Sequence, residues 1–188
     1  MSLLQAQIEP HFLFNTLANV QALVENNSPR AADVLKSLIA YLRAAMPRLH
    51  DQVPTLGNEV TLVRAYLELM QMRMPDRLSF VVNVDSALLA QRFPAMALLT
   101  LVENAVRHGI DPSEQGGHIE VSAAQDGLDL RLWVSDSGVG MAESALAGTG
   151  LNNLRTRIAA FFGPAAELRL SEHVPNGLRA EIFWPLGA

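Results

Sequence analysis

The spacing of the apolar residues changes near Pro75, and this change constrains the fold more than any other feature. Before Pro75, apolar residues recur every three or four positions; after it, they alternate with polar ones, most clearly from Leu128 to Val134. The first spacing is typical of helices that bury one side, and the alternation is typical of strands. We therefore expect an α+β fold with a helical part over residues 1–74 and a sheet-containing part over residues 75–188.

Three helices are expected in the first part. They cover residues 3–25, Ala31–Ala45 and about Asn58–Met74, and an Asn-Asn-Ser-Pro break separates the first two. Their apolar sides are expected at Leu13, Leu17, Val20 and Val24, and at Val34, Leu35, Leu38, Ile39 and Leu42. A single helical hairpin buries such a stripe poorly, whereas two hairpins pair into a four-helix bundle. We therefore expect a homodimer.

Strands and helices mix in the second part. The expected strands are Leu78–Val84, Ile119–Ala123, Leu128–Ser135, Ala166–Ser171 and Leu178–Trp184, the last two joined by a Pro-Asn-Gly turn. The expected helices run from Pro94 to His108 and from Leu151 to Phe162. The Gly-, Ala- and Ser-rich stretch from Ser137 to Gly150 is expected to be a mobile loop.

Composition excludes several classes of function. The 188 residues contain no Cys, so disulfides, thiolate nucleophiles and Cys-ligated metals are absent, and the net charge of -5 argues against direct nucleic-acid binding. The sequence shows no signal peptide and no apolar run of the roughly 20 residues that span a bilayer. We expect a cytoplasmic protein. Because the chain starts as if within a helix, we also expect a longer protein with any membrane segment outside this chain.

His11 carries the first candidate chemistry. At about 100° per residue, His11 and Asn15 share one stripe of the first helix, turned away from Leu13. The imidazole then lies exposed near the Glu9 carboxylate and the Asn15 amide, and a neutral imidazole is a competent nucleophile near neutral pH. The alternative is a surface histidine beside an incidental kink at Pro10.

A polar stripe marks the helix after Pro94. It contains Thr100, Glu103, Asn104, Arg107 and His108, at spacings of three and four residues. Carboxylate and amide oxygens side by side suit Mg²⁺ held together with the phosphates of a nucleotide. The alternative is an ordinary solvated helix face.

Asp136 stands at the end of an alternating strand. It continues the side on which the apolar residues lie, and a carboxylate in such a place needs a hydrogen-bond donor. The apolar residues of this side are Leu128, Leu130, Leu132 and Val134. An adenine amino group is one possible donor, and Gly138 and Gly140 would let the backbone approach a flat base. The alternative is a simple turn at the strand end.

The last candidate is the Gly148–Gly150 segment, which runs directly into a helix. The free N–H groups and positive dipole end of such a helix bind anions. The alternative is a simple helix cap. Each of these motifs is weak alone, but together they can hold Mg²⁺, adenine and phosphates within one α+β layer.

These stretches resemble the motifs of LytS-type sensor histidine kinases, whose ATP-binding domain has the GHKL (Bergerat-type) α/β sandwich fold. Residues 7–15 resemble the phosphoacceptor box, residues 101–109 the N box, residues 136–140 the G1 box, and residues 148–153 with Arg157 the G2 box. The Pro-His-Phe-Leu-Phe-Asn run is specific, whereas the Gly boxes are shared with chaperone, repair and anti-sigma ATPases.

The resemblance implies a protein-histidine kinase that uses Mg·ATP to phosphorylate His11 and passes the phosphoryl group to an aspartate of a response regulator with a DNA-binding output domain. It implies that Asn104 ligates Mg²⁺, that Glu103 assists the metal or its water, and that Asp136 binds adenine. The resemblance also implies nucleotide contacts, beneath a lid of about residues 141–149, from Arg107, His108, Gly138, Gly140, Gly148, Thr149, Gly150, Leu151 and Asn153. No acid directly follows His11, so Glu9 and Asn15 are the neighbours that could assist it.

Two other functions are compatible with these motifs. One is a degenerate, non-catalytic nucleotide-binding dimerisation module that acts on a response regulator by conformation or as a phosphatase. The other is a GHKL-type serine kinase of the anti-sigma kind. In the histidine kinase interpretation, the helical part and the ATP-binding part must swing together, with flexible points expected at residues 46–57 and 74–77.

Overall fold

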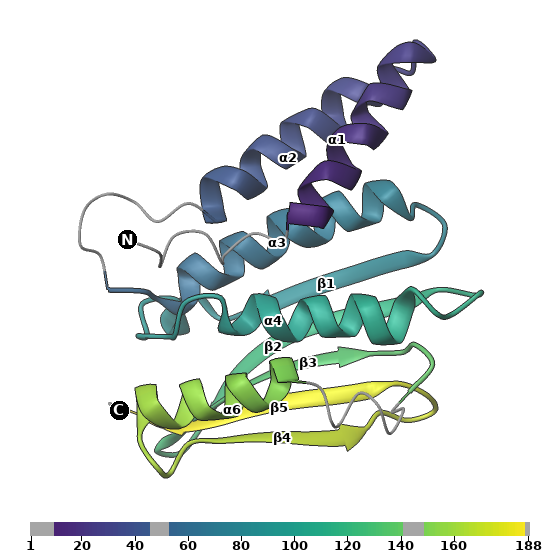
Figure 1. The fold of residues 1–188 in the computed structure, drawn as a ribbon. Coiled ribbons are helices and arrows are strands. Elements are labelled where there is room, and N and C mark those ends of the chain that lie inside the picture. The colour runs from purple at the N-terminus through teal and green to yellow at the C-terminus, as the bar shows by residue number, and fades with distance from the viewer. Residues whose placement is uncertain (1–9, 46–52, 141–148, 187–188) are drawn as a thin grey trace.

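Three helices precede the sheet: α1 (Pro10–Glu25), α2 (Ala31–Ala45) and α3 (Leu56–Arg73). The computed structural model describes residues 10–45, 53–140 and 149–186. The helices α1 and α2 form a hairpin, and α3 lies between this hairpin and the sheet (Figure 1). The bounds of α2 are those expected from the sequence. Helix α3 begins at Leu56 because Thr55 and Asn58 form a reciprocal capping box.

The sheet has five strands in the order β1-β2-β3-β5-β4. The strands are β1 (Leu78–Val84), β2 (Gly117–Asp126), β3 (Asp129–Asp136), β4 (Glu167–Glu172) and β5 (Leu178–Pro185). Strand β1 pairs with β2 in parallel, and the other pairs are antiparallel. Parallel pairing needs a crossover connection, which here contains a helix.

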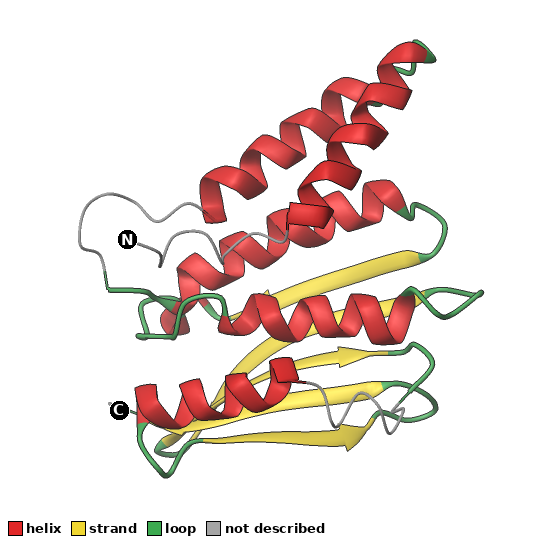
Figure 2. Ribbon diagram, in the orientation of Figure 1, coloured by secondary structure: helices red, strands yellow, loops and turns green. Residues whose placement is uncertain are grey.

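Helices cover one face of the sheet (Figure 2). They are α4 (Ala97–Asn104), which continues into the π-helical segment η2 (Ala105–Ile110), and α6 (Thr149–Phe162); a 3₁₀ turn, η1 (Ser86–Leu88), precedes them. This arrangement confirms the expected α+β class. Within the described ranges, no helix combines the length and the apolar character that a bilayer crossing requires.

One residue of the alternating strand was wrongly assigned to the buried side. Leu128 is 79% exposed and lies in the turn before β3, whereas Leu130, Leu132 and Val134 are buried. Asp126 pairs with Asp129, so residues 127–128 form a tight turn, although the alternation alone would place Leu128 in the strand. The buried side of β3 then continues as far as Asp136, which is 3% exposed, although its neighbour Ser135 is equally buried.

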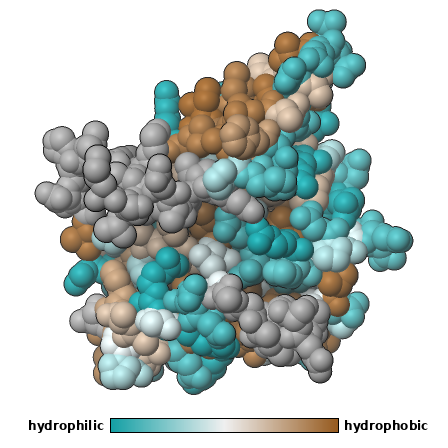
Figure 3. Space-filling model, in the orientation of Figure 1, coloured by the Kyte–Doolittle hydropathy of each residue, from teal (hydrophilic) through white to brown (hydrophobic). Residues whose placement is uncertain are grey.

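The apolar residues of the hairpin lie on two faces rather than one. Helix α2 buries Val34 and Leu38 but leaves Leu35 and Ile39 each 41% exposed, and α1 buries Val20. On α1, the apolar residues Phe14, Leu17 and Val24 are also exposed. Figure 3 shows hydrophobic surface over this hairpin. The inner face therefore packs within the chain, and an outer apolar face remains uncovered by it.

Candidate functional site

His11 is exposed on α1, as the sequence predicts. The Asn15 amide nitrogen lies 3.2 Å from His11 Nε2 and 3.3 Å from Nδ1, so the amide lies across the imidazole one helical turn later. Asn15 can therefore orient the ring. Glu9, the other expected neighbour, lies outside the described residues.

An aromatic cluster holds the turn of α1 that carries His11. The Phe12 ring centroid lies 5.4 Å from that of Tyr41 on α2 and 5.6 Å from that of Tyr66 on α3. The Thr16 hydroxyl also donates a 2.8 Å hydrogen bond to the Phe12 carbonyl. Because Phe12 directly follows His11, this packing sets the position of the imidazole relative to α3.

A cavity of about 190 Å³ brings His11 together with the second part of the chain. Its lining comes from α1, α3, α4, η2 and the residue after η2, and comprises His11, Phe12, Asn15, Tyr66, Met70, Arg73, Glu103, Val106, Arg107 and Asp111. The sequence predicted a histidine that is separate from the ATP-binding part until the two swing together. In the structure, His11 already faces the same cavity as Glu103 and Arg107.

Burial affects the ionisation of one group in the wall of this cavity, the Tyr66 hydroxyl. Burial raises the pKa of the Tyr66 hydroxyl, and the negative charge of Glu103 raises it further. Tyr66 therefore stays neutral and contributes a polar but uncharged wall.

The helix α4 is held at its N-terminus by a residue from α3. Met96 has left-handed backbone (φ 62°), and no side chain of its own segment caps the helix. The Glu59 carboxylate instead accepts hydrogen bonds from the N–H groups of Met96 (2.7 Å) and Leu98 (3.0 Å). For this reason α4 begins at Ala97 rather than at Pro94. The sequence reasoning missed Glu59, whose signal was an acidic residue on the buried side of α3.

Asn104 lies at the end of α4, with a side-chain nitrogen that is buried. Among the residues that the structure describes, this nitrogen has no hydrogen-bond partner. Such an amide is suited to a ligand, and with its oxygen and nitrogen exchanged it would offer oxygen to a metal. No group of three His, Asp or Glu side chains in the described ranges could hold a metal ion. Mg²⁺ fits here only together with phosphate oxygens and water, which is how it is often bound.

The other predicted residues of the polar stripe on α4 and η2 do not all face the same cavity. Glu103 lines the His11 cavity, so it faces the imidazole side, and Arg107 lines that cavity too. His108 is exposed. Since Asn104 follows Glu103 by about 100° around the helix, the two side chains diverge from a common turn.

Asp136 is buried at the end of β3, as predicted. Its Oδ1 accepts a 3.0 Å hydrogen bond from the Gly138 N–H. Burial raises the pKa of this carboxyl, although hydrogen bonds from the backbone of Gly138 and Leu178 and the charge of His173 act in the opposite direction. A buried acceptor with free capacity remains at this strand end, as an adenine-binding carboxylate requires.

Three glycines surround Asp136 closely. A Cβ at Gly138 would overlap the Gly109 carbonyl, and a Cβ at Gly177 would overlap the Asp136 carbonyl. A Cβ at Gly109 would meet the Asp136 carboxylate. The Val139 N–H also donates a 3.1 Å hydrogen bond to the Gly109 carbonyl. The sequence singled out Gly138 but missed the packing roles of Gly109 and Gly177, because these glycines come from η2 and from the turn before β5.

Helix α6, at whose N-terminus the sequence predicts an anion site, begins at Thr149, two residues before the expected start. Gly150 has open space where a Cβ would stand, Leu151 is buried, and Asn153 is exposed. Gly140 has left-handed backbone (φ 85°), which favours glycine. The lid expected at about residues 141–149 falls almost wholly outside the described residues: residues 141–148, which include Gly148, and the side chain of Thr149 are not described.

The fold and this site define a GHKL-type ATP-binding protein that carries a histidine on a helical hairpin. The chain belongs to the family described as histidine kinase-, DNA gyrase B- and HSP90-like ATPases, whose family model matches residues 90–188. A second family model, described as histidine kinase, matches residues 1–78.

The chain is similar to the sensor histidine kinase/phosphatase LytS of Staphylococcus aureus. The two are 34% identical over an alignment of 195 positions, which covers 96% of this chain and 33% of LytS. The chain therefore spans about a third of the length of the curated relatives that it matches.

Two solved histidine kinases share the fold. The histidine kinase domain of the blue-light activated EL346 from Erythrobacter litoralis has a TM-score of 0.54 and 20% identity, with 92% of this chain and 91% of that domain covered. The kinase AdeS from Acinetobacter baumannii has a TM-score of 0.53 and 17% identity, with 96% of this chain and 87% of AdeS covered.

Proposed function

We propose that this chain is the kinase core of a sensor histidine kinase in a two-component system. In this function, Mg·ATP phosphorylates His11, and the phosphoryl group then passes to an aspartate of a response regulator. One observation carries the proposal: the His11 imidazole and the helix that ends in Asn104 share the cavity described above. The family membership and the identity to LytS support the same function.

Different residues of the nucleotide site would bind the adenine, the Mg²⁺ ion and the phosphates. Asp136 would accept a hydrogen bond from the adenine amino group, and Asn104 would ligate Mg²⁺. The backbones of Gly138 and Gly140 would lie against the base, and Arg107 and His108 would lie toward the phosphates. The N-terminus of α6 would hold the phosphates through Gly148, Thr149, Gly150, Leu151 and Asn153. Bound Mg·ATP supplies the phosphoryl group and neutralises part of its charge.

At His11, the attacking ring nitrogen would form a bond to phosphorus while the bond from that phosphorus to the leaving ADP oxygen breaks. The proton on the other ring nitrogen must then leave. Glu103 lines the same cavity and is placed to take it, and Glu9 remains a second candidate. The Asn15 amide would hold the ring in one orientation during this step. In this assignment, Glu103 acts on the imidazole side as well as, or instead of, assisting the metal.

We assign a separate role to each of the two domains expected from the sequence. Residues 1–74 would dimerise and present His11, and residues 75–188 would bind ATP. The exposed apolar face of the hairpin, which includes Leu17, Val24, Leu35 and Ile39, would form the bundle with a second copy. Helix α3 belongs to the first part and packs against both the α1–α2 hairpin and the second part, so it would transmit movement between them. The protein would act at the cytoplasmic side, with any membrane segment outside this chain.

Radiolabelling tests the proposal directly. The chain is incubated with Mg²⁺ and γ-³²P-labelled ATP, and the acid-labile phosphate is mapped to a residue. His11→Ala should lose the label while calorimetry still detects nucleotide binding, and the control His118→Ala, outside the cavity, should keep both. Undiminished labelling of His11→Ala would refute the assignment.

A non-catalytic or phosphatase module is the second candidate, because the relative LytS is named as both kinase and phosphatase. Nucleotide binding without any acid-labile phosphate would favour this candidate. Accelerated loss of phosphate from a phosphorylated response regulator would then identify the phosphatase form.

A further inference from the structure

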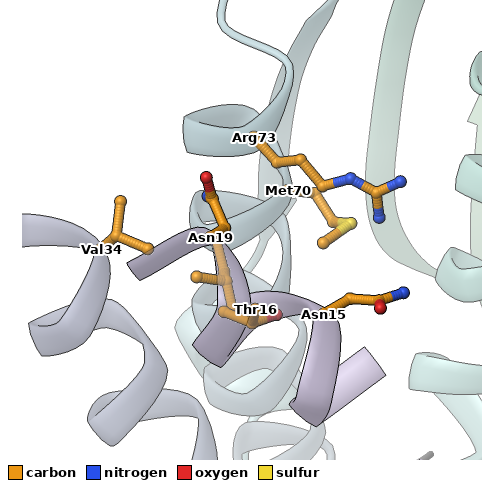
Figure 4. Close-up of a pocket in the computed structure, with 7 residues that line it drawn as sticks. Asn15, Thr16, Asn19, Val34, Met70 and Arg73 are labelled. Atoms are coloured by element: carbon orange, nitrogen blue, oxygen red, sulfur yellow. The ribbon is translucent and has the colours of Figure 1, made fainter. Parts of the chain in front are cut away.

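Arg73, in the last turn of α3, lines two neighbouring cavities. One is the 190 Å³ cavity that contains His11. The other, of about 230 Å³, is lined by Asn15, Thr16, Asn19, Val34, Leu69, Met70 and Arg73. Figure 4 shows that the Arg73 guanidinium and the Asn15 amide extend in the same direction, with Met70 between them. Because that amide contacts the His11 ring, the guanidinium extends toward the imidazole side of the cavity.

The Arg73 side chain is not used to hold the fold together. Within the ranges that the structure describes, its guanidinium makes no hydrogen bond or ion pair. The other arginines of this region do make such interactions. Arg77 donates to carbonyls at the end of η2 and in the segment after it, Arg30 donates to the Met72 carbonyl, and Arg107 has an interaction of its own. Arg73 is therefore a cation of this region that is available to a ligand.

A phosphoryl group on His11 would need such a cation. It would bring about two negative charges into a cavity already lined by the carboxylates of Glu103 and Asp111. Arg107 is the other cation of the lining, and it is already engaged. A guanidinium offers a planar pair of donors that matches two phosphoryl oxygens.

We propose that Arg73 binds the phosphoryl group on His11, both while it is transferred and in the phosphorylated protein. This inference rests on the proposed function, in which His11 accepts the phosphoryl group. In the step, the His11 nitrogen forms the bond to phosphorus, the bond to the leaving group breaks, and the ring proton leaves as described above. Arg73 exchanges no proton. Its guanidinium neutralises negative charge on the oxygens of the phosphoryl group during the transfer.

A small phosphoryl donor tests this role without ATP. With potassium phosphoramidate, the bond from phosphorus to the ammonia nitrogen breaks and ammonia leaves, so the nucleotide site takes no part. The initial rate of His11 phosphorylation is measured by mass spectrometry for the unaltered chain, Arg73→Ala, Arg73→Lys and Arg64→Ala. Arg64 is the matched control because it is an exposed arginine of α3 outside the cavity, bonded to the Val82 carbonyl.

The expected result is a rate about tenfold lower for Arg73→Ala, since a charge-assisted hydrogen bond to the phosphoryl group is lost. Arg73→Lys should recover part of the rate, and Arg64→Ala should match the unaltered chain. Equal rates for Arg73→Ala and the unaltered chain would overturn the inference. Arg73→Gln, which keeps most of the side-chain length, serves the same comparison if the alanine variant unfolds.

Phosphorus NMR of the phosphorylated chain adds a readout that a structural role would not change. A nearby guanidinium favours the dianionic phosphoryl group, so the titration midpoint of the phosphohistidine signal should rise in Arg73→Ala. An unchanged midpoint would also count against the inference. If the unaltered chain is not labelled at His11 by either donor, the proposed function fails and this inference with it, whereas equal labelling of Arg73→Ala overturns this inference alone.

Discussion

The Glu59 carboxylate accepts a 2.7 Å hydrogen bond from the backbone N–H of Met96, and this contact joins α3 to the start of α4. Its other oxygen accepts from the Leu98 N–H, so one buried side chain satisfies two N–H groups that a helix start leaves free. Burial raises the pKa of Glu59, and the positive charge of Arg157 on α6 acts in the opposite direction. The helix that carries Asn104 is therefore anchored from the helical part.

Glu59→Ala should lower the free energy of unfolding by about 1–3 kcal/mol, because two buried N–H groups lose their acceptor. Glu68→Ala, an exposed acid of the same helix, should change it little. Urea unfolding followed by circular dichroism measures both. Equal stability of the two variants would show that the cap contributes nothing.

Gly138→Ala should destabilise the chain in the absence of nucleotide. The added Cβ would overlap the Gly109 carbonyl, and two backbone segments cannot separate cheaply, so we expect a loss of about 1–3 kcal/mol. Gly150→Ala provides the contrast, since its Cβ would meet open space on a helix and should be neutral or slightly stabilising. Thermal unfolding measures the stability of the two variants relative to the unaltered chain. A Gly138→Ala variant as stable as Gly150→Ala would contradict the close packing around Asp136.

The preference for adenine should weaken as the pH falls. Burial raises the pKa of Asp136 above 3.8, so the carboxyl takes up its proton at a higher pH than an ordinary aspartate does. The carboxylate accepts from the adenine amino group better than the acid, and affinity is therefore full above the raised pKa and falls as the pH drops through it. Calorimetry should show that the ratio of ATP affinity to inosine triphosphate affinity declines as the pH falls, since inosine lacks the amino group. A ratio that does not vary with pH in the unaltered chain, or that varies equally in Asp136→Asn, would exclude this role.

Ile39→Asp should convert the proposed dimer to a monomer. Ile39 is 41% exposed on the outer apolar face of the hairpin, and a buried, unpaired carboxylate in a bundle is costly. Ala40→Asp introduces the same charge about 100° further round α2, away from that face, and should leave the dimer intact. Sedimentation measures both variants. If both remain dimeric, the second copy does not bind at this face.

Much of the fold could be predicted because it depends on local pattern. The bounds of α2 and β1 follow from the spacing of apolar residues and from their flanking breaks. The burial of Asp136 follows from alternation along a single strand. Leu128 was predicted to be buried in the strand but lies in the turn before it, because the alternating sequence pattern continues through this turn. The start of α4 was misplaced because its cap comes from a residue distant in the sequence.

Burial of the hairpin was harder to predict. Tyr41 is fully buried with Phe12 and Tyr66, although it was not assigned to the apolar side of its helix. Leu35 and Ile39 were assigned to that side and are 41% exposed in the single chain, on the face that the proposed second copy would cover. Periodicity identifies the apolar residues of a helix but does not say which of two adjacent faces meets α3.

The sequence alone identified the side chains that we propose for the chemistry: the imidazole of His11, the amide of Asn104 and the carboxylate of Asp136, with the glycines that follow it. Residue type and spacing are local properties, so they can be read along the chain. Only the tertiary structure decided that Arg73 and Glu103 share a cavity with His11, and that Gly109 and Gly177 close around Asp136. Those neighbours come from separate elements. Their approach depends on how α3 packs between the hairpin and the sheet, which no local pattern encodes.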